Sequence, residues 1–464
     1  MLRAASRALL PAIVLVLVAA CAREAPRPGT TAAPPNVILF VGEGFGPGAW
    51  AIGRAFAAAH GERLVLDGAE HLGFLEPRSA DRSVTDPAAA ATGWATGRLA
   101  KNGAIGEIGE GGKSPPPNLF ERLADAGRPR GLITTARVTS AIPAPFYART
   151  AVRDDAAAIA AQLIAAMPTL AIGGGRLEFL PDSAAGVRSD GRDLLQEARA
   201  RGVTVLDSLV APLPHDHKVL LLLAPSQLPH EIDRKGGPEL ASLVVAAIRR
   251  LSADGPGWFL LVDEGRIDQA ARDHDGPALA RDVIRLDRAV RAALREVDLK
   301  RTLVVAAADR ATGNPNLGEG ARPDSLDVVS QSVEEMGKRL FDGKPWRGTP
   351  AALQAKALPI LVEGARHAGL GAGDVDRLLS APTQEDRDAA LGTAISRRFG
   401  VVFLAYDDQL SSKSGHGPTG EPVAVRAWGV RSSEVHGVHD HAEFGRWLAD
   451  VLRLPVAPAR SPSK

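Results

Sequence analysis

Continuous apolar runs recur along the chain, and the first of them, residues 36–41, leads directly into a Gly-rich turn at residues 42–46. The run shows no alternation of apolar and polar positions, which is typical of a strand buried on both faces of a parallel sheet. Similar runs occur at residues 130–135, 219–223, 258–262, 302–307 and 401–405. We therefore expect a central, mostly parallel sheet.

Ala-rich stretches of helical character lie between these runs, at residues 155–167, 240–251 and 277–297. Strands that alternate with helices favour an α/β fold with a doubly wound sheet flanked by helices. In such sheets the active groups lie at the carboxyl ends of the strands. Glu43, Asp263 and Asp309 stand at or just beyond such ends and are therefore the first candidates.

Residues 314–398 are richer in Pro, Gly and charged residues than the rest of the chain. We expect them to form an inserted segment that precedes the C-terminal strands.

The first 21 residues have the pattern of a signal peptide, with Arg3 and Arg7 beside an apolar stretch that ends at Cys21. That stretch is too short for a transmembrane helix, and the Pro-rich residues 22–35 after it predict a flexible tether. Residues 18–21 resemble a bacterial lipobox, which predicts a lipidated Cys21; ordinary secretion with a chance cysteine is the alternative. We expect a lipid-anchored protein of the cell envelope, on its periplasmic or outer-membrane side, with no other membrane contact.

The composition narrows the remaining possibilities. The chain is 45% hydrophobic, enough for one large α/β domain or two ordinary ones. We expect one domain at residues 36–454 and a disordered tail at residues 455–464. Its 55 Lys and Arg nearly balance its 54 Asp and Glu, and no basic run is long enough to suggest nucleic acid as a partner. Cys21 is the only cysteine, so no internal disulfide can form.

The most informative motif is residues 83–97, which read SVTDPAAAATGWATG. This segment resembles the nucleophile segment of the alkaline phosphatase family, TDSAAxATxWxTG, with Pro87 where the family has its catalytic serine. The resemblance extends over nearly all of residues 35–453 and implies the family's α/β fold. It rests on residues 36–46, 101–106, 131–147, 173–176, 224–234, 262–268, 308–313 and 415–423.

The resemblance also implies two zinc ions and one magnesium ion, which in the family polarise the phosphate and activate the serine and a water. At the first zinc, the family's Asp-x-x-x-His becomes Asp268 with Arg272, and His416 supplies the distant histidine. Spacing of four places both positions on one helical face. His274 is an alternative ligand, although on a regular helix it would face away from Asp268.

At the second zinc, the family positions are occupied here by Glu43, Pro87, Asp309 and Arg310. Glutamate for aspartate keeps a carboxylate, but proline has no side-chain oxygen. A guanidinium stays protonated and cannot ligate zinc, so arginine for histidine removes a ligand.

At the magnesium site, Glu43 and Asp263 remain as carboxylates, while Ser140 and Ile142 occupy the other positions. Two carboxylates could hold magnesium weakly together with waters. We therefore expect at most one weakly bound metal ion.

Two further positions bear on anion binding. Asp86 is expected to cap the helix that starts at Pro87, because proline is tolerated at the first helical position. Arg153 matches the family's phosphate-clamping arginine, since a guanidinium binds phosphate bidentately; a surface arginine beside Asp154 and Asp155 is the alternative.

The two arginines at zinc positions suggest that guanidinium charge replaces metal charge. We expect Arg272 to pair with Asp268, and Arg310 with Asp309 or Glu43. Together with Arg153 and the positive end of the helix after Asp86, these arginines would form an anion pocket.

Three further groups of residues are weaker candidates for a functional role. Thr85 could act as a displaced nucleophile, although a turn residue is the simpler interpretation. Ser412, Lys413 and Ser414 near His416 suggest a Ser-His pair that nothing orients. The histidines of residues 435–441 (His436, His439 and His441) are expected to be solvated rather than metal-binding.

These residues favour a catalytically degenerate lipoprotein of the alkaline phosphatase family that binds phosphate or a phosphorylated small molecule, with a homodimer as one assembly. The alternative is a weak or atypical metal-dependent phosphohydrolase, in which a residual metal at Asp268 and His416 directs water at phosphorus. The loss of the serine, two histidines and a threonine hydroxyl favours the catalytically degenerate binding protein over the phosphohydrolase.

Overall fold

The computed structural model describes residues 33–106, 115–342, 344–366, 369–403 and 417–455. Several predictions therefore fall outside the described residues: the signal peptide with Cys21, residues 412–414, His416, and nearly all of the tether and of the tail. The chain divides into residues 1–33 and residues 34–464, and the structure below belongs to the second unit.

A ten-stranded sheet organises this unit, in the order β14-β2-β13-β8-β1-β7-β3-β4-β6-β5. All neighbouring strands pair in parallel except β13, which runs antiparallel to β2 and β8. The strands of this sheet are β1 (Asn36–Gly42), β2 (His71–Glu76), β3 (Arg130–Arg137), β4 (Leu170–Gly174), β5 (Thr204–Leu206), β6 (Val219–Leu222), β7 (Phe259–Glu264), β8 (Thr302–Ala308), β13 (Val423–Gly429) and β14 (Val438–Asp440).

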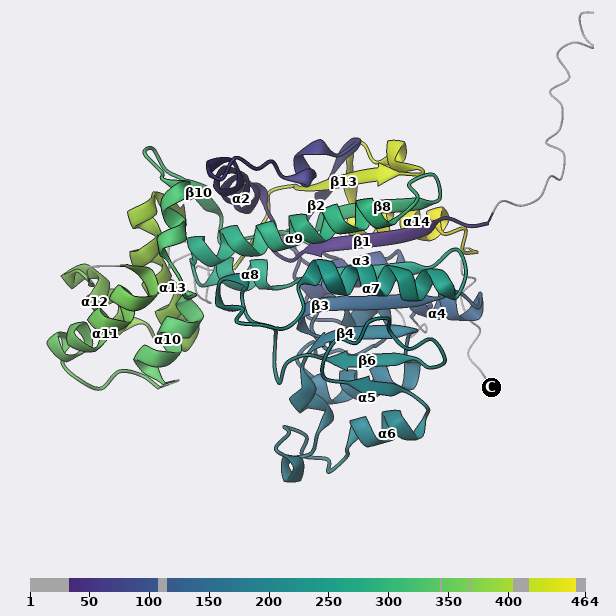
Figure 1. The fold of residues 1–464 in the computed structure, drawn as a ribbon, viewed down its shortest axis with the longest axis horizontal. Coiled ribbons are helices and arrows are strands. Elements are labelled where there is room, and N and C mark those ends of the chain that lie inside the picture. The colour runs from purple at the N-terminus through teal and green to yellow at the C-terminus, as the bar shows by residue number, and fades with distance from the viewer. Residues whose placement is uncertain (1–32, 107–114, 343, 367–368, 404–416, 456–464) are drawn as a thin grey trace, which may run out of the picture. The chain divides into compact units, whose positions relative to one another are not determined.

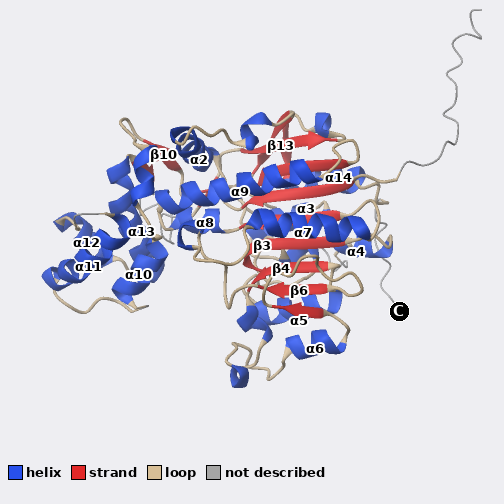
Figure 2. Ribbon diagram, viewed as in Figure 1, coloured by secondary structure: helices blue, strands red, loops and turns tan. Residues whose placement is uncertain are grey.

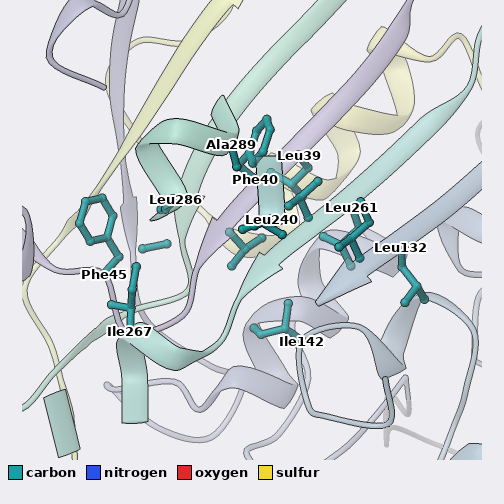
Figure 3. Close-up of a cluster of buried hydrophobic side chains, with 14 of the residues drawn as sticks. Leu39, Phe40, Phe45, Leu132, Ile142, Leu240, Leu261, Ile267, Leu286 and Ala289 are labelled. Carbon is teal, nitrogen blue, oxygen red and sulfur yellow. The ribbon is translucent and has the colours of Figure 1, made fainter. Parts of the chain in front are cut away.

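The expected mostly parallel sheet is confirmed, and its centre is as apolar as the runs predicted. Residues 37–41 of β1 are fully buried, because β7 and β8 flank the strand and helices cover both faces. Figure 3 shows Leu39 and Phe40 in this core with side chains from the neighbouring strands and helices.

The run at residues 401–405 was expected to be a similar buried strand, and that expectation was wrong. Its described part forms β11 (Val401–Phe403), which pairs antiparallel with β10 (Pro315–Leu317) outside the main sheet. Val402 is exposed, because a two-stranded ribbon buries only one of its faces. A second short pair joins β9 (Ala311–Thr312) to β12 (Pro418–Thr419).

Helices cover both faces of the sheet. In Figures 1 and 2, α7 and α9 lie across one face, and α3 packs with α14 on the other. The helices of this region are α2 (Pro47–Ala59), α3 (Pro87–Thr96), α4 (Leu119–Asp125), α5 (Ala156–Ala166), α6 (Leu194–Ala200), α7 (Leu240–Ala253), α8 (Arg266–Arg272), α9 (Gly276–Glu296) and α14 (His441–Val451). Within the described ranges, every helix is too short or too polar to cross a lipid bilayer.

Most of the expected insertion forms a small group of helices, seen at the left of Figure 1. These are α10 (Val333–Phe341), α11 (Pro350–Ala365), α12 (Ala372–Ser380) and α13 (Gln384–Ser396). The group meets the sheet region where Gly392 of α13 lies against the backbone at Asp273 and His274. A Cβ added at Gly392 would come within 1.9 Å of the Asp273 carbonyl oxygen, so only glycine permits this approach.

Candidate functional site

A cleft of about 1060 Å³ lies at the carboxyl ends of the central strands and is lined by residues of α8, α10 and α13. It brings together positions that the chain separates by more than three hundred residues. Its charged lining residues are the cations Arg137, Arg153, Arg266, Arg272 and Lys338 and the acids Glu43, Asp154, Asp268, Asp273, Glu334, Glu385 and Asp388.

Asp268, in the first turn of α8, is the centre of an ion-pair network. Its Oδ2 accepts a hydrogen bond from Arg272 Nε at 2.7 Å, one helical turn away. Its Oδ1 accepts from Arg310 Nη2 at 2.9 Å and from Thr312 Oγ1 at 2.5 Å. Burial alone would raise the pKa of the Asp268 carboxyl, but Arg272, Arg310 and Thr312 outweigh burial and hold this pKa below its ordinary value.

Arg310 follows β8 and is fully buried. Besides Asp268, its guanidinium pairs with Asp309, whose Oδ1 accepts from the backbone N–H of Gly44 at 2.9 Å. Gly44 has a φ of 69°, and a Cβ there would lie 2.7 Å from Asp268 Oδ1. The turn after β1 thus needs glycine to approach both carboxylates, and Arg310 also binds both of them.

These contacts decide how the family's zinc ions would fit. The sequence predicts Asp268 and Asp309 at zinc-ligand positions, but in the structure their oxygens bind Arg272 and Arg310. A guanidinium has no lone pair to offer a metal. Among the described residues, no group of three or more His, Cys, Asp or Glu could hold a metal ion. The described residues therefore do not fit a pair of zinc ions; His416 lies outside them.

The magnesium positions retain less than a full ligand set. Glu43, just beyond β1, is 8% exposed, and its carboxylate makes no hydrogen bond or ion pair within the described residues. Asp263, at the end of β7, accepts from Thr134 Oγ1 at 2.7 Å, while its Oδ1 has no partner there. Burial, together with neighbouring carboxylates, raises the pKa of both groups.

The remaining magnesium positions differ in what they offer the cleft. Ser140 lines it and presents a hydroxyl. Ile142 is fully buried and lies with the apolar core in Figure 3. The position that the sequence predicts to match the family's threonine hydroxyl therefore carries only hydrocarbon.

Helix α3 begins at Pro87, as the sequence predicts. Asp86 caps it by accepting from Ala89 N at 2.9 Å, and its second oxygen accepts from Gly103 N at 3.0 Å and from Arg153 Nη1 at 2.9 Å. Pro87 takes the first helical position, where an N–H would have no partner inside the helix. Arg153 is thus held at the start of α3, on the lining of the cleft.

Of the three predicted anion-binding arginines, Arg153 and Arg272 line the cleft, while Arg310 lies beneath its surface. Arg272 also approaches Glu385 of α13, with Nη1 and Oε1 3.6 Å apart. Each of the three guanidiniums is therefore engaged by at least one carboxylate.

The weaker candidates lie elsewhere. His274 is buried, bonds through Nδ1 to Thr393 Oγ1 at 2.7 Å and stacks on Phe403. The hydroxyl of the buried Thr85 donates to the carbonyl of Asp86 at 3.0 Å, so it is a turn residue.

The expectation of a solvated histidine cluster was wrong for His441. His436 and His439 are exposed, but His441 is fully buried at the start of α14, edge-on to Trp94 of α3. Burial lowers the pKa of His441 to about 4, so the ring is neutral near pH 7. It is a core residue because α14 packs directly on α3.

Sequence reasoning missed the acidic side of the cleft. Asp273 follows α8, while Glu334 lies on α10 and Asp388 on α13. Helices α10 and α13 bring Glu334 and Asp388 to the cleft, although these two acids follow Asp273 in the chain by about 60 and 115 residues. Only the placement of Asp273 directly after Arg272 could have drawn attention to one of them.

Comparison with known proteins places these observations in context. The profile of the family described as "Alkaline phosphatase" matches residues 35–454. The streptomycin-6-phosphate phosphatase of Streptomyces griseus is 32% identical over 413 residues, 77% of this chain and 91% of that protein. The repressible alkaline phosphatase of Saccharomyces cerevisiae is 34% identical over 315 residues, 60% of this chain and only 55% of its own length.

Among solved structures, that of Thermus thermophilus alkaline phosphatase superimposes with a TM-score of 0.78. The alignment covers 95% of this chain and 98% of that one, at 26% sequence identity. The ten-stranded sheet and its helices are therefore those of a known fold.

Proposed function

Because this chain belongs to the alkaline phosphatase family, we propose that it binds a phosphorylated ligand in the cleft without hydrolysing it as an ordinary phosphomonoesterase. The observation that carries the proposal is the buried guanidinium of Arg310, which holds Asp268 and Asp309 together. These two carboxylates would otherwise be available to metal ions.

The chemistry of the site supports a loss of turnover. Ordinary catalysis in this family needs an attacking oxygen and metal ions that stabilise charge on the phosphate. Pro87 provides no oxygen at the start of α3, and Arg272 and Arg310 provide cationic charge without metal coordination. The cationic charge remains, but it is already balanced by carboxylates.

Phosphate recognition is supported by two groups on the lining of the cleft. Arg153 is fixed by Asp86 at the positive end of α3, where backbone dipoles favour an anion. Arg272 is partly exposed and can turn N–H groups toward a ligand while Nε stays on Asp268. Arg310 would act by positioning Asp268 rather than by touching the ligand.

The relatives support the class of ligand only. One of them is named for a phosphorylated aminoglycoside and another is named a repressible alkaline phosphatase. Because the chain spans only 55% of the length of the yeast relative, the activity of that whole protein is not carried over. A weak phosphohydrolase is the second candidate function. It is favoured by Glu43, whose carboxylate makes no hydrogen bond or ion pair within the described residues, and by Asp263, whose Oδ1 has no hydrogen-bond partner there.

The N-terminal sequence supports a cellular location for the protein. The apolar stretch before Cys21 and the polar residues after it fit a lipid-anchored protein of the cell envelope. Mass spectrometry of membrane-extracted full-length protein, compared with Cys21→Ser, tests the anchor. An unmodified N-terminal peptide in the wild type would contradict it.

The test of the main proposal combines metal analysis with a phosphomonoesterase assay from pH 6 to pH 10. We expect no stoichiometric zinc, and turnover no higher than in a preparation of Asp268→Asn. A variant that combines Pro87→Ser, Arg272→His and Arg310→His is the matched comparison, because it returns the missing ligand types to the same fold. Two zinc ions per wild-type chain with turnover well above the Asp268→Asn control would overturn the proposal.

A further inference from the structure

The cations of the cleft are all paired, whereas some of its acids are not. Arg137 pairs with Glu178, Arg153 with Asp86, Arg266 with Glu334, Arg272 with Asp268, and Lys338 with Glu334 and Glu335. In the described part of the chain, no ion pair involves Glu43, Asp273 or Asp388, although all three line the cleft. Among the described residues, these three carboxyl groups of the cleft are therefore left without a cation at ion-pair distance.

Asp273 and Asp388 form a matched pair of carboxylates. Each accepts one hydrogen bond from a glutamine four residues earlier, Gln269 to Asp273 at 2.9 Å and Gln384 to Asp388 at 2.8 Å. In each case the bond reaches Oδ1, and Oδ2 accepts no hydrogen bond within the described residues. A carboxylate with a free oxygen on a cleft is a ready acceptor for an N–H donor.

Glu43 is an independent sign of a missing partner. It belongs to the turn after β1, not to the inserted helices, and only 8% of its surface is exposed to solvent. Its carboxylate faces the cleft without any hydrogen bond or ion pair from the described residues. Burying such a group without a partner is unfavourable, so the site is better satisfied when something donates to it.

We propose that the ligand of this cleft carries ammonium or guanidinium groups as well as its anionic group, and that Asp273, Asp388 and Glu43 bind these cationic groups. The proposal rests on the proposed function for the anionic half of the ligand, which Arg153 and Arg272 would hold. An organic cation suits the acids better than a metal ion, because no group of three or more His, Cys, Asp or Glu among the described residues could hold a metal ion. Several N–H donors on a flexible ligand can instead reach separate carboxylates.

The electrostatics agree with this geometry. Burial, with Glu334 nearby, raises the pKa of Asp388 to about 7. Burial and Asp388 raise the pKa of Asp273 as well. A bound ammonium group would favour the ionised carboxylates, since an opposite charge at short range lowers the pKa of an acid.

The experiment is calorimetric titration of the full-length protein at pH 7.5 with two probes that differ in one group, glucosamine 6-phosphate and glucose 6-phosphate. We expect the amino sugar to bind about tenfold more tightly, the ratio typical of one added charge-assisted contact. In Asp273→Asn/Asp388→Asn, which keeps both side-chain shapes, the ratio should fall to about one. Arg153→Gln should weaken both probes and leave the ratio unchanged.

Spermidine, titrated alone, separates this inference from the proposed function. If neither sugar phosphate binds but spermidine binds to the wild type and not to the double variant, the acidic site stands and the phosphate site fails. Equal affinity for the two sugars, with spermidine binding absent or indifferent to Asp273 and Asp388, would overturn the inference. Mg²⁺ binding that is lost in the double variant without any binding of spermidine would also overturn it, because the site would then be a metal site.

Discussion

Arg310 donates from Nη2 to Asp268 Oδ1 at 2.9 Å, although the two residues are 42 positions apart and the arginine is wholly buried. The contact arises from strand order, since β1 lies between β7 and β8. The segments that follow these parallel strands therefore emerge at one edge. Gly44 therefore lies close to both Asp268 and Asp309, and Arg310 binds the carboxylates of these two residues.

Replacing Arg310 by methionine should destabilise the protein strongly. Asp268 and Asp309 would lose their shared buried counter-charge, and breaking a buried pair from one side costs about 3–5 kcal/mol. Urea unfolding followed by circular dichroism measures the change. Arg249→Met is the matched control, because Arg249 forms an exposed pair with Glu296. That variant should lose less than about 1 kcal/mol; equal losses in the two variants would show that Arg310 is not a structural counter-charge.

Asp86 and Pro87 are neighbours whose substitution should have unequal effects. Asp86→Ala removes the cap of α3 and leaves Arg153 with only its longer contact to Asp154, 3.8 Å from Nε to Oδ1, at a cost of about 1–2 kcal/mol. Pro87→Ala removes no hydrogen bond and should cost less than about 1 kcal/mol, mostly through the freer unfolded chain. Thermal unfolding of both variants compares them. A larger loss for Pro87→Ala would mean that proline itself holds the turn.

Gly337→Ala should loosen the packing of the inserted helices. A Cβ at this position of α10 would come within 2.2 Å of Asp388 Oδ1 on α13. Overpacking of this kind costs about 1–3 kcal/mol, and hydrogen exchange should rise in α10 and α13. Gly373→Ala on α12 is the control, because a Cβ there meets nothing within 4 Å. It should be neutral or stabilising by up to about 1 kcal/mol.

Asp388 should make stability fall as the pH rises. Its folded pKa of about 7 lies above the ordinary 3.8, because burial and Glu334 outweigh Gln384, Arg387 and Lys338. Between these values the folded state binds more protons than the unfolded state, so the free energy of unfolding decreases from about pH 4 to pH 7.

Asp388→Asn removes this titration. The stability of the variant relative to the wild type should therefore increase between pH 4 and pH 8, by up to about 4 kcal/mol. Urea unfolding at both pH values measures this difference. A constant difference across the range would contradict the raised pKa.

The sequence predicted the centre of the fold well, because a strand that is buried on both faces of a parallel sheet needs apolar residues at every position. Such a strand therefore appears in the sequence as a continuous apolar run. Residues 36–41 and 302–307 are of this kind and became β1 and β8. The run at residues 401–405 was misjudged, since an apolar run does not reveal whether its partners belong to the main sheet or to a two-stranded ribbon. His441 was wrongly expected to be solvated, because the sequence does not show that α14 packs on α3 and places the ring of His441 against Trp94.

By itself, the sequence determined which chemical groups are present: Pro87 stands at the predicted nucleophile position, and Arg272 and Arg310 stand at predicted histidine positions of the family pattern. Helical periodicity alone also predicts that Arg272 reaches Asp268. Only the tertiary structure decided that Arg310 binds Asp268 as well as Asp309, and that Asp273 and Asp388 share a cleft with Arg153. The reason is physical. Local spacing fixes contacts within one helix, whereas strand order and the docking of inserted helices bring together charges that the chain holds far apart.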